Sequence, residues 1–251
     1  MQARTLAGTA RARVGARLEG WLRAATCAVL GDDGAPLPLL RMPTGEGALD
    51  ALLDGGLPRG RLVELFGGPG SGKTTLALRV AAAAQAHGAV AWLDVDGALE
   101  PARAAAAGVE LGRLVVARPT TGEQALQIAE ALVRSRSCAL VVVDSVAALL
   151  PKAELAAPLG EAAPGLQARM LSLGLRRLVH ASLHSGATGL FVNQTRLALD
   201  GDVPELVTAG GSALRFYAAL RLELTRSPAG CALRIVKNRH GPEGGTVGIT
   251  P

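Results

Sequence analysis

The chain has 251 residues, of which 49% are hydrophobic and 2% aromatic, and its formal net charge at pH 7 is +5. This length fits one large α/β domain with an appendage, and the scarcity of aromatic residues requires a core of Ala, Val and Leu. The positive charge permits an acidic partner such as nucleic acid. Three widely separated cysteines argue against a disulfide framework, and neither a secretory signal nor a membrane-spanning run is present, so we expect a cytoplasmic protein without membrane association.

Residues 1–44 are expected to form an amphipathic helix and a linker. Apolar residues recur at roughly helical spacing between Leu6 and Leu22. Residues 1–30 carry a net charge of +4, from five arginines against Glu19. The apolar stripe packs either on the chain's own core or on another subunit, and the arginines either contact nucleic acid or form a solvated face.

A phosphate-binding loop is expected at residues 67–75, which read Gly-Gly-Pro-Gly-Ser-Gly-Lys-Thr-Thr. An apolar run of strand length precedes this motif and an Ala- and Leu-rich helical stretch follows it, which separates a real P-loop from a chance match. The glycines let backbone N–H groups turn around phosphates, and the helix dipole favours the anion. Lys73 is expected to reach the β- and γ-phosphates, and the Thr74 hydroxyl to ligate Mg²⁺. The nucleotide-binding residues predicted from the loop are Gly67, Gly68, Pro69, Gly70, Ser71, Gly72, Lys73, Thr74 and Thr75.

Apolar runs and helical stretches alternate along the rest of the chain. Strands are expected at residues 61–66, 90–95, 114–117, 139–144 and 190–193, with helices at 74–86 and near 99–107, 122–135 and 165–184. This alternation predicts an α/β fold with a mostly parallel sheet flanked by helices. Two further strands, at 216–224 and 231–236, predict a C-terminal antiparallel hairpin. Residues 45–251 would together form one P-loop domain.

Polar side chains follow three of the predicted strands. Asp144 ends a valine-rich run, where P-loop nucleotide hydrolases place the carboxylate that holds Mg²⁺. The second strand ends at Asp94 and Asp96, and we expect Asp96 to orient the attacking water. In the alternative interpretation, one of these two aspartates caps the helix that begins near residue 98. Gln194 follows the fifth strand and is expected to sense the γ-phosphate. The segment 195–211 after it is predicted to be a long loop.

Several stretches beyond the loop resemble the RecA family of recombinase ATPases, in register over roughly residues 45–250. They are Gly72-Lys-Thr-Thr-Leu76, Thr121-Gly-Glu-Gln-Ala-Leu126, Val141-Val-Val-Asp-Ser-Val-Ala-Ala148, Pro151-Lys-Ala-Glu154, Arg215-Phe-Tyr-Ala218 and Ile235-Val-Lys-Asn238. The resemblance implies a RecA-like ATPase core with ATP and Mg²⁺ as cofactors. It also implies that Lys73, Asp96 and Gln194 are catalytic and that Thr74 and Asp144 hold the metal.

The resemblance further implies contacts outside this nucleotide site. Lys237 and Arg239 match a basic pair that reaches the nucleotide of the adjacent subunit in a filament. Arg169 and Arg176 match arginines near the DNA-binding loops, and Arg196 is a third candidate for DNA contact. Ordinary surface charge is the alternative for these cations.

The departures from the family pattern bear on activity. Asp96 is one methylene shorter than the family's glutamate, so we expect slow hydrolysis at best. Pro69 replaces an acid in the phosphate loop, and Arg103 replaces an aromatic residue that stacks on adenine. The segments 155–165 and 195–211 are poor in cations and lack aromatic residues, whereas single-strand binders usually offer them. We expect no counterpart of the family's C-terminal domain.

Two functions remain open at this point. One is a regulatory paralogue of damage-induced mutagenesis, similar to the short ImuA type, that works with RecA and the subunits of an error-prone polymerase. This protein would be a weak ATPase, a monomer or small oligomer alone, and a weak binder of single-stranded DNA. The other is an active DNA-dependent ATPase that forms its own filament on single-stranded DNA.

Overall fold

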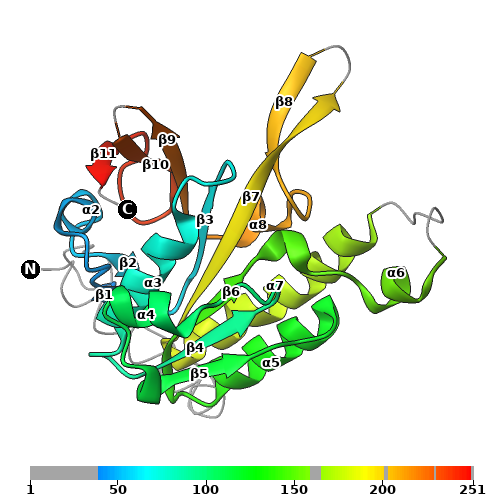
Figure 1. Ribbon diagram of the computed structural model, residues 1–251, viewed down its shortest axis with the longest axis horizontal. Helices are drawn as coiled ribbons and strands as arrows, with labels where there is room; N and C mark the ends of the chain where they lie inside the picture. The colour runs from blue at the N-terminus through cyan, green and yellow to red at the C-terminus, as the bar shows by residue number, and fades with distance from the viewer. Residues whose placement is uncertain (1–38, 159–164, 201–202, 229, 250–251) are drawn as a thin grey trace, which may run out of the picture. The chain divides into compact units, whose positions relative to one another are not determined.

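The computed structural model describes residues 39–158, 165–200, 203–228 and 230–249, with backbone alone for 197–200 and 203–205 (Figure 1). The chain divides into two units, residues 1–38 and 39–251. The first unit, including the expected amphipathic helix and its arginines, lies outside the described residues. The domain boundary expected at residue 45 stays a prediction.

Nine strands of the described residues form one sheet, in the order β11–β10–β9–β3–β7–β6–β4–β5, with β8 paired to β7. The strands from β9 to β5 in this order are parallel, whereas β10 and β11 continue the sheet antiparallel to their neighbours. A separate antiparallel pair joins β1 (Arg41–Met42) to β2 (Leu57–Pro58). The strands of the large sheet are β3 (Leu62–Gly67), β4 (Ala89–Asp94), β5 (Leu114–Ala117), β6 (Cys138–Asp144), β7 (Thr188–Asp200), β8 (Val203–Thr208), β9 (Leu220–Ser227), β10 (Gly230–Asn238) and β11 (Thr246–Ile249).

Helices pack on both faces of this sheet, so the fold has three layers (Figure 1). Residues of α2 (Gly47–Leu52), α3 (Lys73–Ala84) and α4 (Pro101–Ala106) contribute to the apolar core on one face. Residues of α5 (Gly122–Arg134), α7 (Leu166–Ser185) and α8 (Ala213–Tyr217) contribute to the core on the other face. A short helix, α6 (Lys152–Ala156), and two 3₁₀ turns, η1 (Leu111–Arg113) and η2 (Val146–Ala148), lie in the connections.

The central strand β6 explains why the sheet is buried on both sides. Leu140 and Val142 belong to the core that includes α3, whereas Val141 and Val143 belong to the core that includes α5 and α7. A strand covered on both faces needs an unbroken apolar sequence, which is the signal that predicted it. The parallel strands and their flanking helices confirm the α/β prediction.

The loop predicted at residues 195–211 is largely a hairpin, so that prediction was wrong. Strand β7 runs on to Asp200 and pairs antiparallel with β8, and the two strands extend beyond their neighbours in Figure 1. An Asp-Gly-Asp tripeptide between two apolar-rich runs is the hairpin signal in this sequence.

The C-terminal strands also differ from their predicted bounds. Residues 216–217 belong to α8, and β9 begins only at Leu220. Burial of Ala213 and Leu214 against the core beside α7 holds this turn as a helix despite the strand propensity of Phe216 and Tyr217. Strand β11 was not predicted, because its four residues include a glycine and give a weak strand signal.

Candidate nucleotide-binding site

Residues 67–75 connect the end of β3 to the start of α3, as the sequence predicts. A Cβ atom on Gly67 would lie 2.0 Å from the carbonyl oxygen of Leu224, so the strand can accommodate only glycine there. Gly72 precedes α3 with a φ of 98°, which favours glycine. The first backbone N–H groups of α3 have no acceptor within the helix. They form the donor row at which an anion binds.

Lys73 lies buried beneath this loop. Its Nζ donates hydrogen bonds to the Gly68 carbonyl oxygen at 2.7 Å and to Ser71 Oγ at 3.3 Å. Burial lowers the pKa of Lys73, and the neighbouring Asp144 carboxylate partly opposes this effect. An ammonium group held by neutral acceptors would gain strongly from a phosphate oxygen, because charge-assisted hydrogen bonds are the stronger ones.

Thr74 and Asp144 meet although 70 residues separate them in the chain. The Thr74 hydroxyl donates to Asp144 Oδ2 at 2.9 Å. Burial raises the pKa of Asp144 to about 6, the Thr74 hydrogen bond opposes the rise, and the charges of Asp96 and Asp94 add to it. A hydroxyl and a buried carboxylate fit Mg²⁺, a hard cation that prefers oxygen ligands.

The metal would also need ligands from the nucleotide. Among the described residues, no group of three or more His, Cys, Asp or Glu side chains could hold a metal ion. Mg²⁺ sites commonly combine one or two protein oxygens with substrate phosphates and water. Thr74 and Asp144 suit that kind of site, in which Mg²⁺ would neutralise phosphate charge.

Asp96 and Gln194 reach the same cavity as the loop. This cavity has a volume of about 290 Å³, and its lining includes Pro69, Gly70, Gly72, Lys73, Thr74, Asp96, Arg103, Asp144, Ser145 and Gln194. The predicted strand-end residues therefore come together at the carboxyl edge of the parallel strands, where α/β folds bind their ligands.

Asp94 has a different place from Asp96. Its Oδ1 accepts a hydrogen bond from the Leu99 backbone N–H at 3.1 Å, and its Oδ2 pairs with Arg118 Nε at 2.9 Å. Asp94 is buried, whereas Asp96 is exposed and lines the cavity. Asp94 thus binds the backbone just before α4 and does not cap this helix, whose N-cap residue is Glu100. Asp96 remains the candidate for orienting water.

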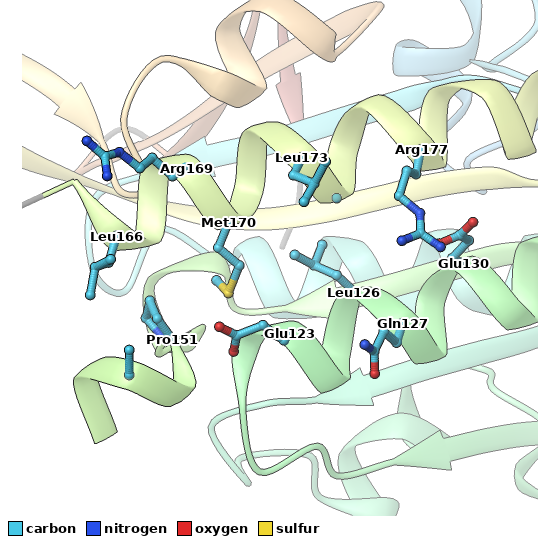
Figure 2. A pocket seen from close by; sticks show the side chains of 12 residues that line it. Glu123, Leu126, Gln127, Glu130, Pro151, Leu166, Arg169, Met170, Leu173 and Arg177 are labelled. Carbon is cyan, nitrogen blue, oxygen red and sulfur yellow. The ribbon is translucent and has the colours of Figure 1, made fainter. Parts of the chain in front are cut away.

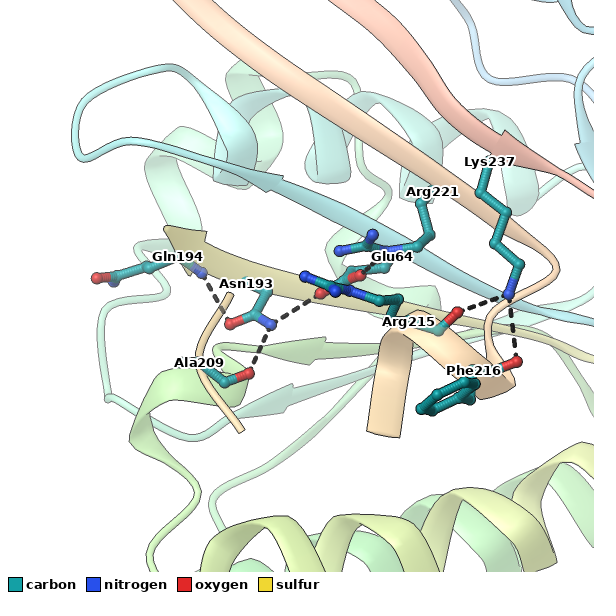
Figure 3. Close-up of polar contacts among 8 residues, drawn as sticks. All are labelled: Glu64, Asn193, Gln194, Ala209, Arg215, Phe216, Arg221 and Lys237. Atoms are coloured by element: carbon teal, nitrogen blue, oxygen red, sulfur yellow. Dashed lines mark hydrogen bonds and ion pairs between the residues drawn. The ribbon is translucent and has the colours of Figure 1, made fainter. Parts of the chain in front are cut away.

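A buried polar network begins beside Gln194 (Figure 3). The Gln194 backbone N–H donates to Asn193 Oδ1 at 2.8 Å, and Asn193 Nδ2 donates to Glu64 Oε1 at 2.9 Å and to the Ala209 carbonyl oxygen at 3.0 Å. Glu64 Oε2 accepts from Arg221 Nε at 2.5 Å. Through Asn193 on β7 and Ala209 just after β8, this network joins the base of the β7–β8 hairpin to β3 and β9.

Sequence reasoning missed the network of Glu64, Asn193 and Arg221. A glutamate inside the apolar run of β3 was the available signal, because a buried acid needs a partner. Arg221 is the partner because β9 runs parallel beside β3 and places the two residues directly opposite each other. That register could not be inferred from the sequence pattern.

Lys237 and Arg239 lie away from the cavity that the P-loop lines. Lys237 Nζ donates to the carbonyl oxygens of Arg215 at 2.6 Å and Phe216 at 3.2 Å, and Arg239 donates to the latter oxygen at 2.7 Å. Burial lowers the pKa of Lys237, and the charges of Arg239 and Arg221 lower it further. Figure 3 shows the Lys237 ammonium pointing at the end of α8, where the Phe216 side chain is 64% exposed.

The three candidate DNA-binding arginines are exposed on two elements. Arg169 and Arg176 lie on α7, and Arg196 lies on β7 two residues beyond Gln194. Arg169 is also at the edge of a cavity of about 360 Å³ between α5 and α7, shown in Figure 2. Leu126, Met170 and Leu173 line this cavity, which is larger and more apolar than the one at the P-loop. Its apolar lining suits neither phosphate nor Mg²⁺, so the polar cavity is the candidate nucleotide site.

None of the helices in the described residues is long and apolar enough to cross a bilayer. The loop residues from Pro69 to Thr74 that line the polar cavity share it with Asp96, Asp144 and Gln194, whereas the cations predicted to contact DNA or a neighbouring subunit do not line it.

Comparisons with known proteins agree with this geometry. A family model described as "RecA N-terminal domain" matches residues 23–238. The chain is 46% identical over 227 residues to Protein RecA of Kineococcus radiotolerans, covering 85% of this chain and 65% of that protein. It is 48% identical over 201 residues to Protein RecA of Frankia alni, and 49% identical over 201 residues to that of Acidothermus cellulolyticus. Each of these two matches covers 78% of this chain and 58% of the relative, so the chain spans about three fifths of the relatives' length.

Proposed function

The chain belongs to the RecA family, and from that premise we propose that it binds ATP with Mg²⁺ and acts as a regulatory RecA paralogue in DNA repair. The observation that carries the proposal is the contact of Thr74 with Asp144 in the cavity that the buried Lys73 also lines. Lys73 supplies N–H donors and a positive charge for the phosphates of a nucleoside triphosphate, and Thr74 and Asp144 supply oxygen ligands for its Mg²⁺. They share one cavity with the side chains that would act on the γ-phosphate.

Each side chain has a distinct role in this proposal. Lys73 would leave the Gly68 carbonyl oxygen and bind the β- and γ-phosphates. Thr74 and Asp144 would hold Mg²⁺, which supplies electrostatic stabilisation to the phosphoryl group. Asp96 would orient the attacking water, and Gln194 would respond to the γ-phosphate through the base of the β7–β8 hairpin.

Slow hydrolysis follows from the chemistry of Asp96. An aspartate carboxylate on an exposed loop reaches about one methylene less far than a glutamate would. A displacement of about 1 Å in a positioned water can cost around 100-fold in rate. ATP would then act mainly as a ligand that sets the conformation of the protein, as suits a regulatory paralogue.

The basic pair at the end of β10 supports an action on a neighbouring protein. Lys237 and Arg239 donate only to backbone carbonyl groups in the described residues, beside the exposed Phe216. Cations that donate to neutral carbonyl oxygens can exchange them for the phosphates of a nucleotide held by an adjacent subunit. We propose that this subunit is RecA, and that subunits of an error-prone polymerase are further partners.

The main test is ATP hydrolysis with and without single-stranded DNA. We expect a slow rate that DNA stimulates weakly, because the candidate DNA-binding segments carry few cations. Strong stimulation by single-stranded DNA, with sedimentable filaments of the protein alone, would replace this proposal with the active recombinase.

A second test addresses the partner. We expect the protein to cosediment with RecA filaments in the presence of ATP and to slow their growth. Replacing both Lys237 and Arg239 by alanine should weaken this effect and leave binding of ATP to the protein's own loop intact. Arg234→Ala is a matched control on β10, because that arginine is paired with Glu223 at 2.7 Å. Absence of RecA association in every nucleotide state would contradict the partner proposal.

A further inference from the structure

Arg103 brings a second cation to the nucleotide cavity. It lies on α4, two residues after the proline that begins this helix, and its Nη2 donates a hydrogen bond to Thr75 Oγ1 at 2.7 Å. The side chain lines the same cavity as Lys73 and Thr74. The contact joins α4 to α3 across 28 positions of the chain.

The position of Thr75 shows which part of a nucleotide Arg103 faces. Lys73, Thr74 and Thr75 are the first three residues of α3, and the first hydrogen bond from a backbone N–H within the helix comes from Leu76, to Gly72 O. A phosphate chain along this donor row would place its terminal phosphate near Lys73, Asp144 and Gln194. The phosphate next to the sugar would then lie at the Thr75 end.

The bonding of Arg103 leaves it available to an anion. In the part of the chain that the structure describes, its hydrogen bond goes to a neutral hydroxyl and it forms no ion pair. A guanidinium has five N–H donors, so most of its donors remain unused. Its planar fork matches two oxygens of one phosphate.

The charges lining the cavity also favour a phosphate contact. Lys73 and Arg103 are the cations among the described lining residues, and Asp96 and Asp144 are the acids. Lys73 is close enough to Asp144 for each to affect the other's pKa. A nucleotide–Mg²⁺ complex still carries negative charge. Because Lys73 already interacts with Asp144, Arg103 is the cation that can compensate this remaining negative charge.

We propose that Arg103 binds the nucleotide phosphate next to the sugar, exchanging the Thr75 hydroxyl for phosphate oxygens. This inference rests on the proposed binding of ATP at the loop and adds a specific residue to it. The contact would serve ATP and ADP alike and would not depend on the base. Arg103 is thus a binding residue that recognises a nucleotide of at least two phosphates without selecting the terminal one.

The test compares affinities for ATP, ADP and GTP, measured by displacement of a fluorescent ATP analogue in the presence of Mg²⁺. Arg103→Ala should weaken all three by a similar factor of about ten, the range of one charge-assisted contact. Arg103→Lys should recover part of the loss, because it keeps the charge and loses the fork. The salt dependence of ATP binding should also decrease in Arg103→Ala. Alanine suits an exposed helical position, so the variant should fold.

Arg113→Ala is the control, because that arginine is exposed and pairs with Glu110 outside the cavity. Equal affinities in wild type and Arg103→Ala would overturn the inference. A loss confined to ATP would assign Arg103 to the terminal phosphate, and a changed ratio of ATP to GTP affinity would assign it to the base; either result refutes the proposal. If the wild type binds no nucleotide, the proposed function itself fails, which is a distinguishable result.

Discussion

Arg221→Met would leave the Glu64 carboxylate buried without its cation. The Glu64 side chain is fully buried and that of Arg221 is 8% exposed, and their closest atoms are 2.5 Å apart. The hydrogen bond from Asn193 Nδ2 to Glu64 Oε1, at 2.9 Å, would remain. Breaking a buried pair by removing one partner typically costs 3–5 kcal/mol, because the remaining charge is desolvated and uncompensated. We therefore expect the free energy of unfolding to fall by about 3 kcal/mol or more.

Equilibrium urea unfolding at neutral pH measures this change. Arg234→Met is the matched control, because its ion pair with Glu223 has an arginine side chain that is 56% exposed. Such exposed pairs contribute about 1 kcal/mol or less. The double variant Glu64→Leu with Arg221→Met should be more stable than Arg221→Met alone, since it removes the uncompensated Glu64 charge. A loss in Arg221→Met no larger than in the control would refute the reasoning.

Three further predictions concern two residues of the site, Asp144 and Asp96. Burial raises the pKa of Asp144 from 3.8 to about 6, so between these values the folded protein holds a proton that the unfolded chain releases. The stability of the nucleotide-free protein should fall as pH rises from about 4 to 6, and urea unfolding of Asp144→Asn across this range should show a smaller fall. Binding of the Mg²⁺ nucleotide should weaken below about pH 6 in the wild type, where Asp144 is protonated. Asp96→Glu should raise the rate of phosphate release if water positioning limits hydrolysis, and an unchanged or lower rate would show that another step is limiting.

The phosphate loop and the central strands could be predicted because their signals are local. Nine consecutive residues specify the loop, and the valines of β6 specify a strand buried on both faces. The polar residues at the strand ends were also predictable, because parallel strands bring their carboxyl ends to one edge. Asp94 was the exception, since its hydrogen bond from the Leu99 backbone N–H and its pair with Arg118 depend on the path of the intervening chain.

The remaining features depend on contacts between distant segments. The Glu64–Arg221 pair needs the parallel register of β3 and β9, and the Arg103–Thr75 contact needs the packing of α4 beside α3. The helix at residues 213–217 forms because it packs beside α7, against the local strand propensity of Phe216 and Tyr217. The β7–β8 hairpin does have a local signal, the tripeptide Asp200-Gly-Asp202 between two apolar-rich runs, but this segment was interpreted as a loop.

The central claim is that Lys73 and its loop bind a nucleotide, and a thermal unfolding measurement tests it most directly. At an ATP concentration about 100 times the dissociation constant, with Mg²⁺, binding adds about 2.7 kcal/mol to stability. In a domain of this size that corresponds to a rise in Tm of roughly 5 °C or more. Lys73→Ala should abolish this rise, and Lys152→Ala, a change at an exposed lysine, should keep it. An equal rise in wild type and Lys73→Ala would contradict the account.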